Sequence, residues 1–523
     1  MQTFLVSLLE HYKLSLEDLR ERNLPGSFLR LKTPYDDSNF KNVVKRLKDA
    51  ISKKEKTVIY GDYDVDGLTS TAILKRTLDE LGLNPGYFIP SRYKEGYGLV
   101  KERVLDFKKK GYSLIITVDN GISAFEAIDE ARKLGMEVVI IDHHEIPEKK
   151  VNTPYIFHQN ISPFISYNCS AASLCFFVSY SLLNRYDEYL ATLAGIAVFS
   201  DVMPLLGNNL ELVKIALSSF KKYNYSNLMA LIPAKNEPLC YDDFNFSIIP
   251  ALNSVGRVEM DVMATNKACK LLIENKNIDE IKRLSSYVLS INEKRKKIVK
   301  EIKIDDKVSF ESAHSFSSMV NQTSGLCGLF ANSLLREKDK SILIFAPDEK
   351  NPEYLVGSIR AKEGYDLISF LENNKKYFIT CGGHKQACGV TINKKDYYQV
   401  VVLFSTEIEK QALNVTDKKD DVISIAFEDL TKDNYETFES FLPFGEGFQK
   451  VKFEITVDKS DVKVASSNKA SFVYSSDRSR KITYFGIPKE LNEVGDSITF
   501  VGDFKKEIFN NRVSYVLVSN KSY

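Results

Sequence analysis

The chain has 523 residues, of which 44% are hydrophobic and 27% are charged, a composition typical of globular proteins. Its length predicts about three or four domains. No apolar stretch reaches the roughly 20 residues that a membrane-spanning helix needs, and residues 1–9 are too short and too polar at their flanks for a secretory signal. The sequence therefore predicts a cytoplasmic protein with no membrane partner.

The net charge and the cysteines limit the kinds of binding site and cross-link that the chain can contain. A net charge of +1 provides no overall attraction for nucleic acid, so any binding of a polyanion must come from local clusters. The seven cysteines include no CxxC pair, which argues against a zinc module and gives no disulfide framework. We expect scattered reduced thiols.

The first 205 residues change pattern near residue 56. Residues 1–55 have a mixed helical pattern interrupted by Pro25 and Gly26, which predicts a helical lead-in. Residues 56–205 alternate between short apolar runs and helical patterns. The predicted strands are residues 58–60, 114–118 and 138–141, and the predicted helices include residues 68–81 and 124–134. This alternation predicts an α/β domain with a parallel sheet of βαβ units.

Acidic residues follow each of the three predicted strands. Asp62, Asp64 and Asp66 follow the first, Asp119 follows the second, and the triplet Asp142-His143-His144 follows the third. Because ligands gather at the carboxyl ends of parallel strands, these side chains are expected to meet at one edge of the sheet. Carboxylates this close together would repel one another unless cations neutralised them, and oxygen ligands suit hard ions such as Mg²⁺ or Mn²⁺.

Two other interpretations of the acidic segment are weaker. The run Asp-x-Asp-x-Asp-Gly also opens the calcium loop of EF-hands, but position twelve, which should be Glu, is Ile73, and the preceding residues are typical of a buried strand and not of a helix. A solvated acidic turn would explain residues 62–67 but not the later segments. Two divalent cations would instead activate water and neutralise phosphoryl oxygens, which favours hydrolysis of a phosphate ester or anhydride.

The rest of the chain predicts three further parts. Residues 206–304 form a helical connector, in which the basic run 294–297 is interpreted as a solvated helix face in preference to a DNA contact. Residues 305–415 form a second α/β domain, with a strand at 342–345 and a glycine-rich turn at 381–384. Residues 420–523 contain short strands separated by turn signals, which fit a β-barrel of the OB type or a sandwich.

Seven segments occur in the order found in the DHH family of phosphoesterases, and this order is most similar to that of its RecJ-type exonucleases. They are DYDVDG, TVDNGIS, DHH, FSDVMPL, NSVGR, GSIRA and GGHKQACG. The resemblance implies a DHH domain and a DHH-associated domain joined by a long helix, followed by an OB domain. It also implies hydrolysis of single-stranded DNA from the 5′ end to mononucleotides, in recombination and repair.

The resemblance assigns roles to individual residues. One metal ion would be held by Asp62, Asp64 and Asp119, and the other by Asp66, Asp119, His143 and Asp201. His144 would contact the scissile phosphate, Asp142 would orient the histidines, and His384 would close on the same phosphate. The terminal 5′-phosphate would bind Arg92, Arg257, Ser358 and Arg360, although a single Arg is often only a surface ion pair.

The resemblance leaves several points open. Bases could stack on aromatic residues of the OB-like tail, which are more often core residues: Phe472, Tyr474, Tyr484 and Phe485. Thr323-Ser324-Gly325 replaces the usual His-Glu-Gly, which could alter substrate preference. A monomer is expected, with a helicase or a single-strand-binding protein as a further partner. The alternatives are a DHH phosphoesterase acting on short oligonucleotides, 3′-phosphoadenosine phosphate or cyclic dinucleotides, and an inactive scaffold that binds single strands.

Overall fold

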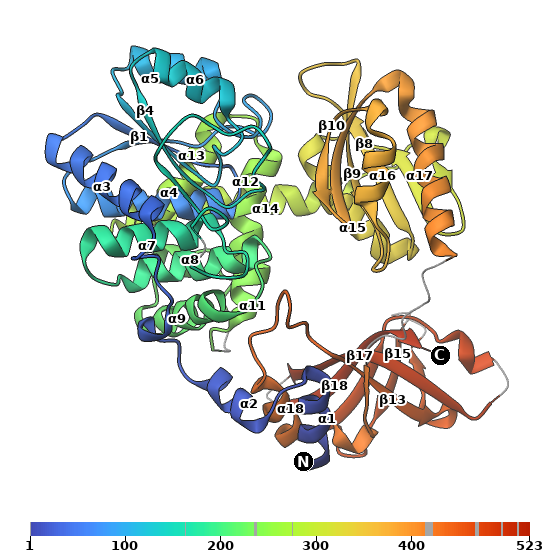
Figure 1. Cartoon of the computed structure of the whole chain (residues 1–523). Coiled ribbons are helices and arrows are strands. Elements are labelled where there is room, and N and C mark those ends of the chain that lie inside the picture. The colour runs from blue at the N-terminus through green and yellow to red at the C-terminus, as the bar shows by residue number, and fades with distance from the viewer. Residues whose placement is uncertain are drawn as a thin grey trace. The chain divides into compact units, whose positions relative to one another are not determined.

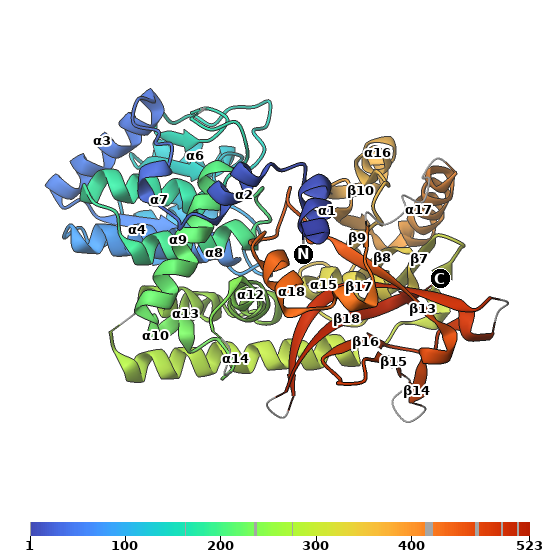
Figure 2. The same cartoon turned by 90° about the horizontal axis from the view of Figure 1, so that it is seen from below.

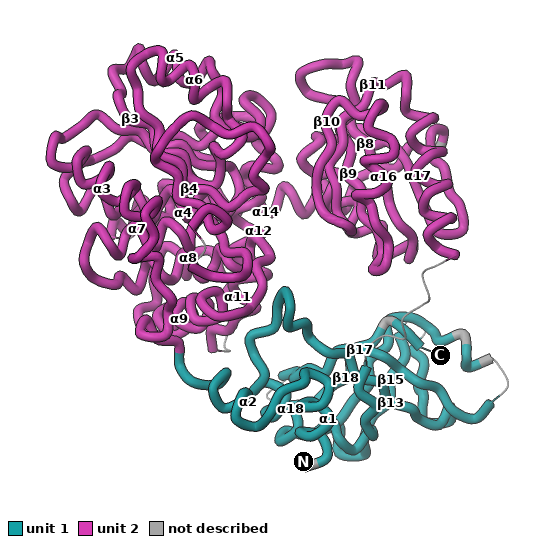
Figure 3. The backbone as a smooth tube through the Cα atoms, in the orientation of Figure 1, with its two compact units in different colours: residues 1–25, 417–523 teal, residues 26–416 magenta. Residues whose placement is uncertain are grey.

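The structure is a computed structural model of the chain (Figure 1). It describes residues 2–162, 164–234, 238–274, 276–413, 422–465, 470–492, 495–509 and 512–522. The chain divides into two compact units (Figure 3). The terminal unit consists of Met1–Pro25 and Asp417–Tyr523, and the central unit of Gly26–Thr416.

The first sheet of the central unit is parallel, as predicted. Its strand order is β2-β1-β3-β4-β5, and all neighbouring strands run in the same direction. The strands are β1 (Thr57–Tyr60), β2 (Gly86–Phe88), β3 (Leu114–Val118), β4 (Glu137–Asp142) and β5 (Ile156–His158). The register pairs Tyr60 with Thr117 and Val118 with Ile141, so β1, β3 and β4 end at the same edge.

Helices cover both faces of this sheet, because successive strand residues point to opposite sides. Tyr60 and Ile115 belong to the apolar core under α5 (Lys101–Lys109) and α6 (Phe125–Lys133). Ile59 and Ile116 belong to the core on the other side. That core includes α3 (Ser38–Lys53), α4 (Val65–Glu80), α7 (Ala171–Leu183) and α8 (Glu188–Ser200).

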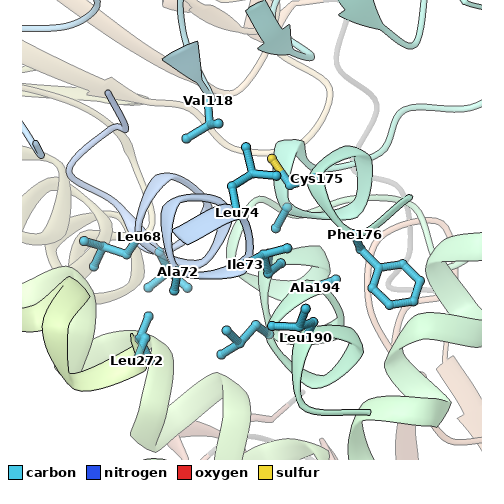
Figure 4. Close-up of a cluster of buried hydrophobic side chains, with 14 of the residues drawn as sticks. Leu68, Ala72, Ile73, Leu74, Val118, Cys175, Phe176, Leu190, Ala194 and Leu272 are labelled. Atoms are coloured by element: carbon cyan, nitrogen blue, oxygen red, sulfur yellow. The ribbon is translucent and has the colours of Figure 1, made fainter. Parts of the chain in front are cut away.

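Helix α4 is buried along most of its length. Figure 4 shows side chains of α4 among those of the neighbouring elements, the labelled ones being Leu68, Ala72, Ile73, Leu74, Val118, Cys175, Phe176, Leu190, Ala194 and Leu272. Full burial of a Leu or Ile side chain contributes about 1.5–3 kcal/mol. The packing therefore fixes the position of the first turn of α4, which carries Asp66.

A helical segment connects the two sheets of the central unit. Its helices are α9 (Gly207–Tyr223), α10 (Ser226–Met229), α11 (Tyr241–Asp243), α12 (Ile249–Val258), α13 (Val262–Ile273) and α14 (Ile278–Glu301). Helix α14 has 24 residues and lies against α12 and α13 (Figure 2).

The second sheet of the central unit has the order β10-β11-β9-β8-β7-β6. Its strands are β6 (Phe310–Glu311), β7 (Ser315–Met319), β8 (Ser341–Pro347), β9 (Tyr354–Arg360), β10 (Phe378–His384) and β11 (Ala387–Asn393). The helices of this part are α15 (Cys327–Lys338), α16 (Leu367–Asn373) and α17 (Tyr397–Ala412). The predicted turn at 381–384 is wrong, because these residues form the end of edge strand β10 and pair with β11.

The terminal unit combines both ends of the chain. Helices α1 (Gln2–Tyr12), α2 (Leu16–Asn23) and α18 (Lys432–Glu439) accompany a seven-stranded sheet of order β12-β13-β17-β18-β16-β15-β14. The strands are β12 (Val422–Ser424), β13 (Lys452–Asp458), β14 (Lys463–Ala465), β15 (Ala470–Tyr474), β16 (Arg480–Tyr484), β17 (Ser497–Phe509) and β18 (Arg512–Ser522). Phe4 of α1 stacks on Phe453 of β13 with ring centroids 5.7 Å apart.

The predicted fold class is confirmed: a parallel-sheet α/β part, a second α/β part after a long helix, and a β-rich part consistent with an OB-like fold. The domain boundaries stay a prediction. The structure places residues 1–25 with the C-terminal strands, whereas the sequence suggests one lead-in over residues 1–55, and the boundary near residues 415–420 lies outside the described residues. None of the described helices has the length and apolar character needed to cross a membrane.

Candidate functional site

The loop after β1 folds back onto the start of α4. Asp64 caps the helix, since its Oδ1 accepts a hydrogen bond from Gly67 N at 3.1 Å. A Cβ on Gly67 would lie 2.5 Å from Asp62 N, so this position requires glycine. From α12, Asn253 Oδ1 accepts a hydrogen bond from Val65 N at 3.1 Å. The close approach places the three carboxylates of the loop and the first helical turn together.

Asp66 is oriented by another helix. Its two carboxylate oxygens accept hydrogen bonds from Ala171 N at 2.7 Å and Ala172 N at 2.8 Å, at the N-terminus of α7. These donors leave the second lone pair of each oxygen available for a cation. The helix N-terminus also favours the ionised form of this carboxyl group.

Asp119 lies directly after β3 in a left-handed backbone conformation, with φ of 60°. Such a conformation is uncommon for a residue other than glycine and is often found at functional sites. Its Oδ1 is 3.1 Å from His143 Nε2, and that nitrogen is 3.3 Å from Asp201 Oδ2 at the end of α8. Three elements thus converge on His143.

Asp142 holds the histidine loop. Its Oδ1 accepts hydrogen bonds from His143 N at 2.8 Å and His144 N at 3.2 Å, and it is 2.8 Å from His144 Nδ1. Its Oδ2 accepts a hydrogen bond from Ile122 N at 3.0 Å. With Nδ1 of His144 directed to Asp142, Nε2 is the nitrogen left for another partner.

Ligand atoms of these residues lie close enough to share cations. Three groups each bring their nitrogen or oxygen atoms within 4.8 Å of one another: Asp62, Asp64 and Asp119; Asp66, His143 and Asp201; and Asp119, His143 and His144. Asp119 and His143 each belong to two of them. The first group is the ligand set that the resemblance implies for one ion. The second group lacks Asp119 from the set implied for the other ion, and the third adds His144, so the assignment to two metal ions stays a prediction.

The electrostatics of this acidic cluster (Asp62, Asp64, Asp66, Asp119 and Asp201) favour cation binding. Burial and neighbouring carboxylates raise the pKa of Asp62, Asp119 and Asp201 well above the usual range, and raise that of Asp66 to about 7. Within the described part of the chain, only His143 and His144 form ion pairs with the cluster. Asp62 Oδ1 is buried and has no hydrogen-bond partner there. Mg²⁺ or Mn²⁺ fits this donor set of oxygens and one imidazole.

The two histidines have opposite protonation behaviour. Burial and the charge of His144 lower the pKa of His143 to about 4, which favours the neutral form that ligates metals. Burial disfavours charge on His144, but the hydrogen bond to Asp142 and the charges of Asp142, Asp201 and Asp64 together outweigh burial and raise the pKa of His144 to about 9. His144 is therefore suited to donate a proton.

The predicted phosphate pocket draws on distant segments of the central unit. Arg360 Nη1 donates to Ser358 Oγ at 2.8 Å. Burial, together with the charges of Arg92 and Arg360, lowers the pKa of Arg257 to about 10, so these side chains lie near one another. Arg92 lies over the Tyr63 ring, with its guanidinium carbon 4.3 Å from the ring centroid. Tyr63 separates Asp62 from Asp64, which links this pocket to the acidic cluster.

His384 does not contact the acidic cluster. His384 is exposed at the end of β10, and among the described residues no hydrogen bond or ion pair joins it to the acidic cluster. In the terminal unit, Phe485 is 66% and Tyr474 40% exposed, so these rings are accessible for stacking. Phe472 stacks on Tyr474 and Tyr484 packs against Phe500, which is typical of structural aromatics.

Two residues at the site were missed by the sequence analysis. The Tyr97 ring lies 5.2 Å from that of His144, and Tyr97 OH is 3.3 Å from Asp119 O. Buried His158 faces His144 O at 2.7 Å through Nε2. The position of Tyr97 between Gly96 and Gly98 could have suggested it, but His158 ends the short strand β5 with no motif around it.

Residues 56–198 match the family model described as the DHH family, N-terminal domain. The chain carries a DHH domain. RecJ of Bacillus subtilis, named a single-stranded-DNA-specific exonuclease, is 27% identical over 504 residues, which cover 92% of this chain and 62% of that protein. RecJ of Escherichia coli is 26% identical over 395 residues, which cover 69% of this chain and 67% of that protein. The chain therefore resembles RecJ along most of its length, but spans only 62% of the first of these relatives.

Solved structures share the fold around the DHH domain. RecJ from Thermus thermophilus, solved in complex with Mn²⁺, has a TM-score of 0.75 at 20% identity over 93% of this chain and 72% of that one. The same protein in complex with Mg²⁺ has a TM-score of 0.73 at 19% identity over 99% and 74%. Similar chains have thus been solved with each of the two ions that the donor set favours.

Proposed function

We infer that this chain is a metal-dependent exonuclease that degrades single-stranded DNA from the 5′ end and releases mononucleotides. One observation carries the proposal: in the central unit a largely buried acidic cluster lies next to arginine side chains that have no carboxylate ion pair among the described residues. The first suits phosphodiester hydrolysis, and the second suits a phosphate of the strand. The name of the RecJ relatives, single-stranded-DNA-specific exonuclease, supports the choice of substrate.

The residues have separate tasks in this proposal. Asp62, Asp64, Asp66, Asp119, His143 and Asp201 would hold two divalent cations, Mn²⁺ or Mg²⁺, which would supply an activated water and neutralise the charge that develops on the phosphoryl oxygens. His144, with its Nδ1 held by Asp142, donates a proton from Nε2 to the leaving 3′ oxygen. His384 closes on the same phosphate.

The direction of degradation, from the 5′ end, follows from the phosphate pocket. Arg92, Arg257, Ser358 and Arg360 hold a terminal 5′-phosphate, so that only the adjacent phosphodiester reaches the acidic cluster. The exposed aromatics Tyr474 and Phe485 hold bases further along the strand. A role in DNA recombination and repair, a cytoplasmic location, a monomeric state, and a helicase or single-strand-binding partner belong to the same proposal.

Substrate competition tests this function. A long 5′-phosphorylated single strand, the corresponding duplex and a dinucleotide are incubated separately with the chain and Mn²⁺. We expect the single strand to be degraded fastest. Preference for the dinucleotide would indicate a phosphoesterase for short substrates, and binding without hydrolysis would indicate a scaffold. Retained activity in the Asp119→Ala, His143→Ala double variant would contradict the assigned site.

A further inference from the structure

A fourth arginine, Arg295 of α14, belongs to the group formed by Arg92, Arg257 and Arg360. Its charge, like those of Arg92 and Arg360, disfavours the protonated form of Arg257. Helix α14 lies against α12, which carries Arg257 in its last turn. Buried Asn292, one turn before Arg295 on the same face of α14, has an Oδ1 atom with no hydrogen-bond partner among the described residues.

None of the four guanidinium groups forms an ion pair with a carboxylate in the described part of the chain, although the charge of Asp64 acts on Arg257 and that of Glu293 on Arg295. By contrast, Arg46 pairs with Glu55 and Arg103 with Glu95. The Nε atoms of Arg92 and Arg295 are buried and have no hydrogen-bond partner among those same residues. Buried donors without partners cost stability, so such a group of cations is expected to bind an anion.

The neighbours of Arg295 in the basic run behave differently. Lys294 Nζ is 3.0 Å from Glu259 Oε1 and Lys296 Nζ is 2.7 Å from Glu293 Oε1, and both lysine side chains are more than half exposed, at 54% and 56%. The solvated-face interpretation of residues 294–297 therefore describes these two lysines. Arg295 is half-buried and points its unpartnered Nε away from solvent.

Charge balance indicates what the fourth arginine binds. A terminal phosphate carries about −1.5 to −2 at neutral pH, which Arg92, Arg257 and Arg360 already exceed. Each further phosphodiester of a strand adds one negative charge. We propose that Arg295 binds a backbone phosphate beyond the terminal one, so that the pocket grips two phosphates of the same strand.

This inference rests on the proposed function, and a binding assay separates the two. Dissociation constants of a 5′-phosphorylated single strand are measured without Mg²⁺ or Mn²⁺ over a range of salt concentrations. The variants are Arg295→Gln, Arg295→Lys and the exposed matched control Lys296→Gln. We expect Arg295→Gln to bind about tenfold more weakly, which corresponds to about 1.4 kcal/mol, because the variant loses a hydrogen bond to a charged phosphate. Its salt slope should fall by about 0.7, and Arg295→Lys should restore part of the slope.

Modified strands locate the phosphate. The loss caused by Arg295→Gln should persist on a strand with a 5′-hydroxyl, whereas the loss caused by Arg360→Gln should disappear there. A neutral methylphosphonate at one internal linkage should abolish the difference between Arg295→Gln and the unaltered chain. If Arg295→Gln binds like Lys296→Gln while the unaltered chain still degrades single strands, the inference is wrong and the proposed function stands.

Two further outcomes are equally decisive. Lower thermal stability of Arg295→Gln together with an unchanged salt slope would show a structural role and would overturn the inference. If the unaltered chain neither binds nor degrades single strands, both proposals fail.

Discussion

The acidic cluster of the central unit and its arginine group (Arg92, Arg257, Arg295 and Arg360) carry opposite charges and are neighbours. Five carboxylates gather at strand and helix ends without a Lys or Arg ion pair among the described residues, and four guanidinium groups gather near α12 without a carboxylate ion pair there. Either group alone would be costly to bury. Each group would therefore be stabilised by a charge that comes from outside the chain: cations fit the first, and we propose phosphates for the second.

The largest effect on activity is expected from removing the charge of Asp119, which two of the ligand groups share. Asp119→Asn deletes a charge that belongs to two of the ligand groups. Because a bound metal contributes several kcal/mol of charge stabilisation, we expect hydrolysis to fall by about a thousandfold or more. Initial rates with Mn²⁺ measure the effect, and exposed Asp129→Asn on α6 is the matched control. Equal rates for the two variants would contradict the metal assignment.

Metal binding should also change stability. The acidic cluster repels itself, so a cation that binds only the folded chain should stabilise it by about 2.7 kcal/mol at a concentration 100 times its dissociation constant. Thermal unfolding with Mn²⁺ and with a chelator measures this difference. We expect the Mn²⁺-dependent rise in melting temperature to be much smaller in Asp119→Asn. An equal rise in both would place the bound ion elsewhere.

The arginine group is tested by the choice of strand end. Arg360→Gln removes a donor for the terminal phosphate, so cleavage of 5′-phosphorylated strands should slow by about tenfold to a hundredfold. Hydrolysis of a small phosphodiester should slow far less, because the acidic cluster is intact. Exposed Arg336→Gln, whose side chain bonds its own helix, is the control. Equal slowing of both substrates would count against end binding.

The smallest predicted effect tests the position of the Arg360 guanidinium in the phosphate pocket. A Cβ on Gly328 would lie 2.7 Å from Arg360 Nη2, so Gly328→Ala should displace this guanidinium. A side chain forced off its rotamer costs about 0.5–1.5 kcal/mol, which corresponds to about a twofold to tenfold loss. The ratio of rates on 5′-phosphate and 5′-hydroxyl strands measures it. Gly382→Ala, where a Cβ meets nothing within 4 Å, should leave the ratio unchanged.

The two charge groups differ in how far the sequence predicts them. Asp62, Asp119 and Asp142 follow apolar runs, and the rule that parallel strands end at one edge is enough to predict that these side chains meet. The arginine group is assembled from β9, α12, α14 and the loop after β2, and no periodicity indicates that α14 packs against α12 and brings the charge of Arg295 near Arg257. The sequence does not predict Tyr97 and His158 for the same reason, since they reach the histidine loop only through tertiary packing.

Other differences arise from strand pairing. The glycines at 381–384 predict a turn locally, yet pairing with β11 holds them in an edge strand. Residues 1–25 have helical patterns that the sequence cannot assign to a partner, and their apolar side chains complete the core of the terminal unit. In both cases a contact distant in sequence decides the structure.

The central claim is that the acidic cluster cuts a strand whose 5′ end the arginine group holds. Its most direct test follows the products over time from a 5′-phosphorylated single strand labelled at either end, with Mn²⁺ and with Mg²⁺. The account predicts that the 5′ label appears first, as a mononucleotide, while the 3′ label remains on progressively shorter strands. Early release of a mononucleotide that carries the 3′ label would contradict it.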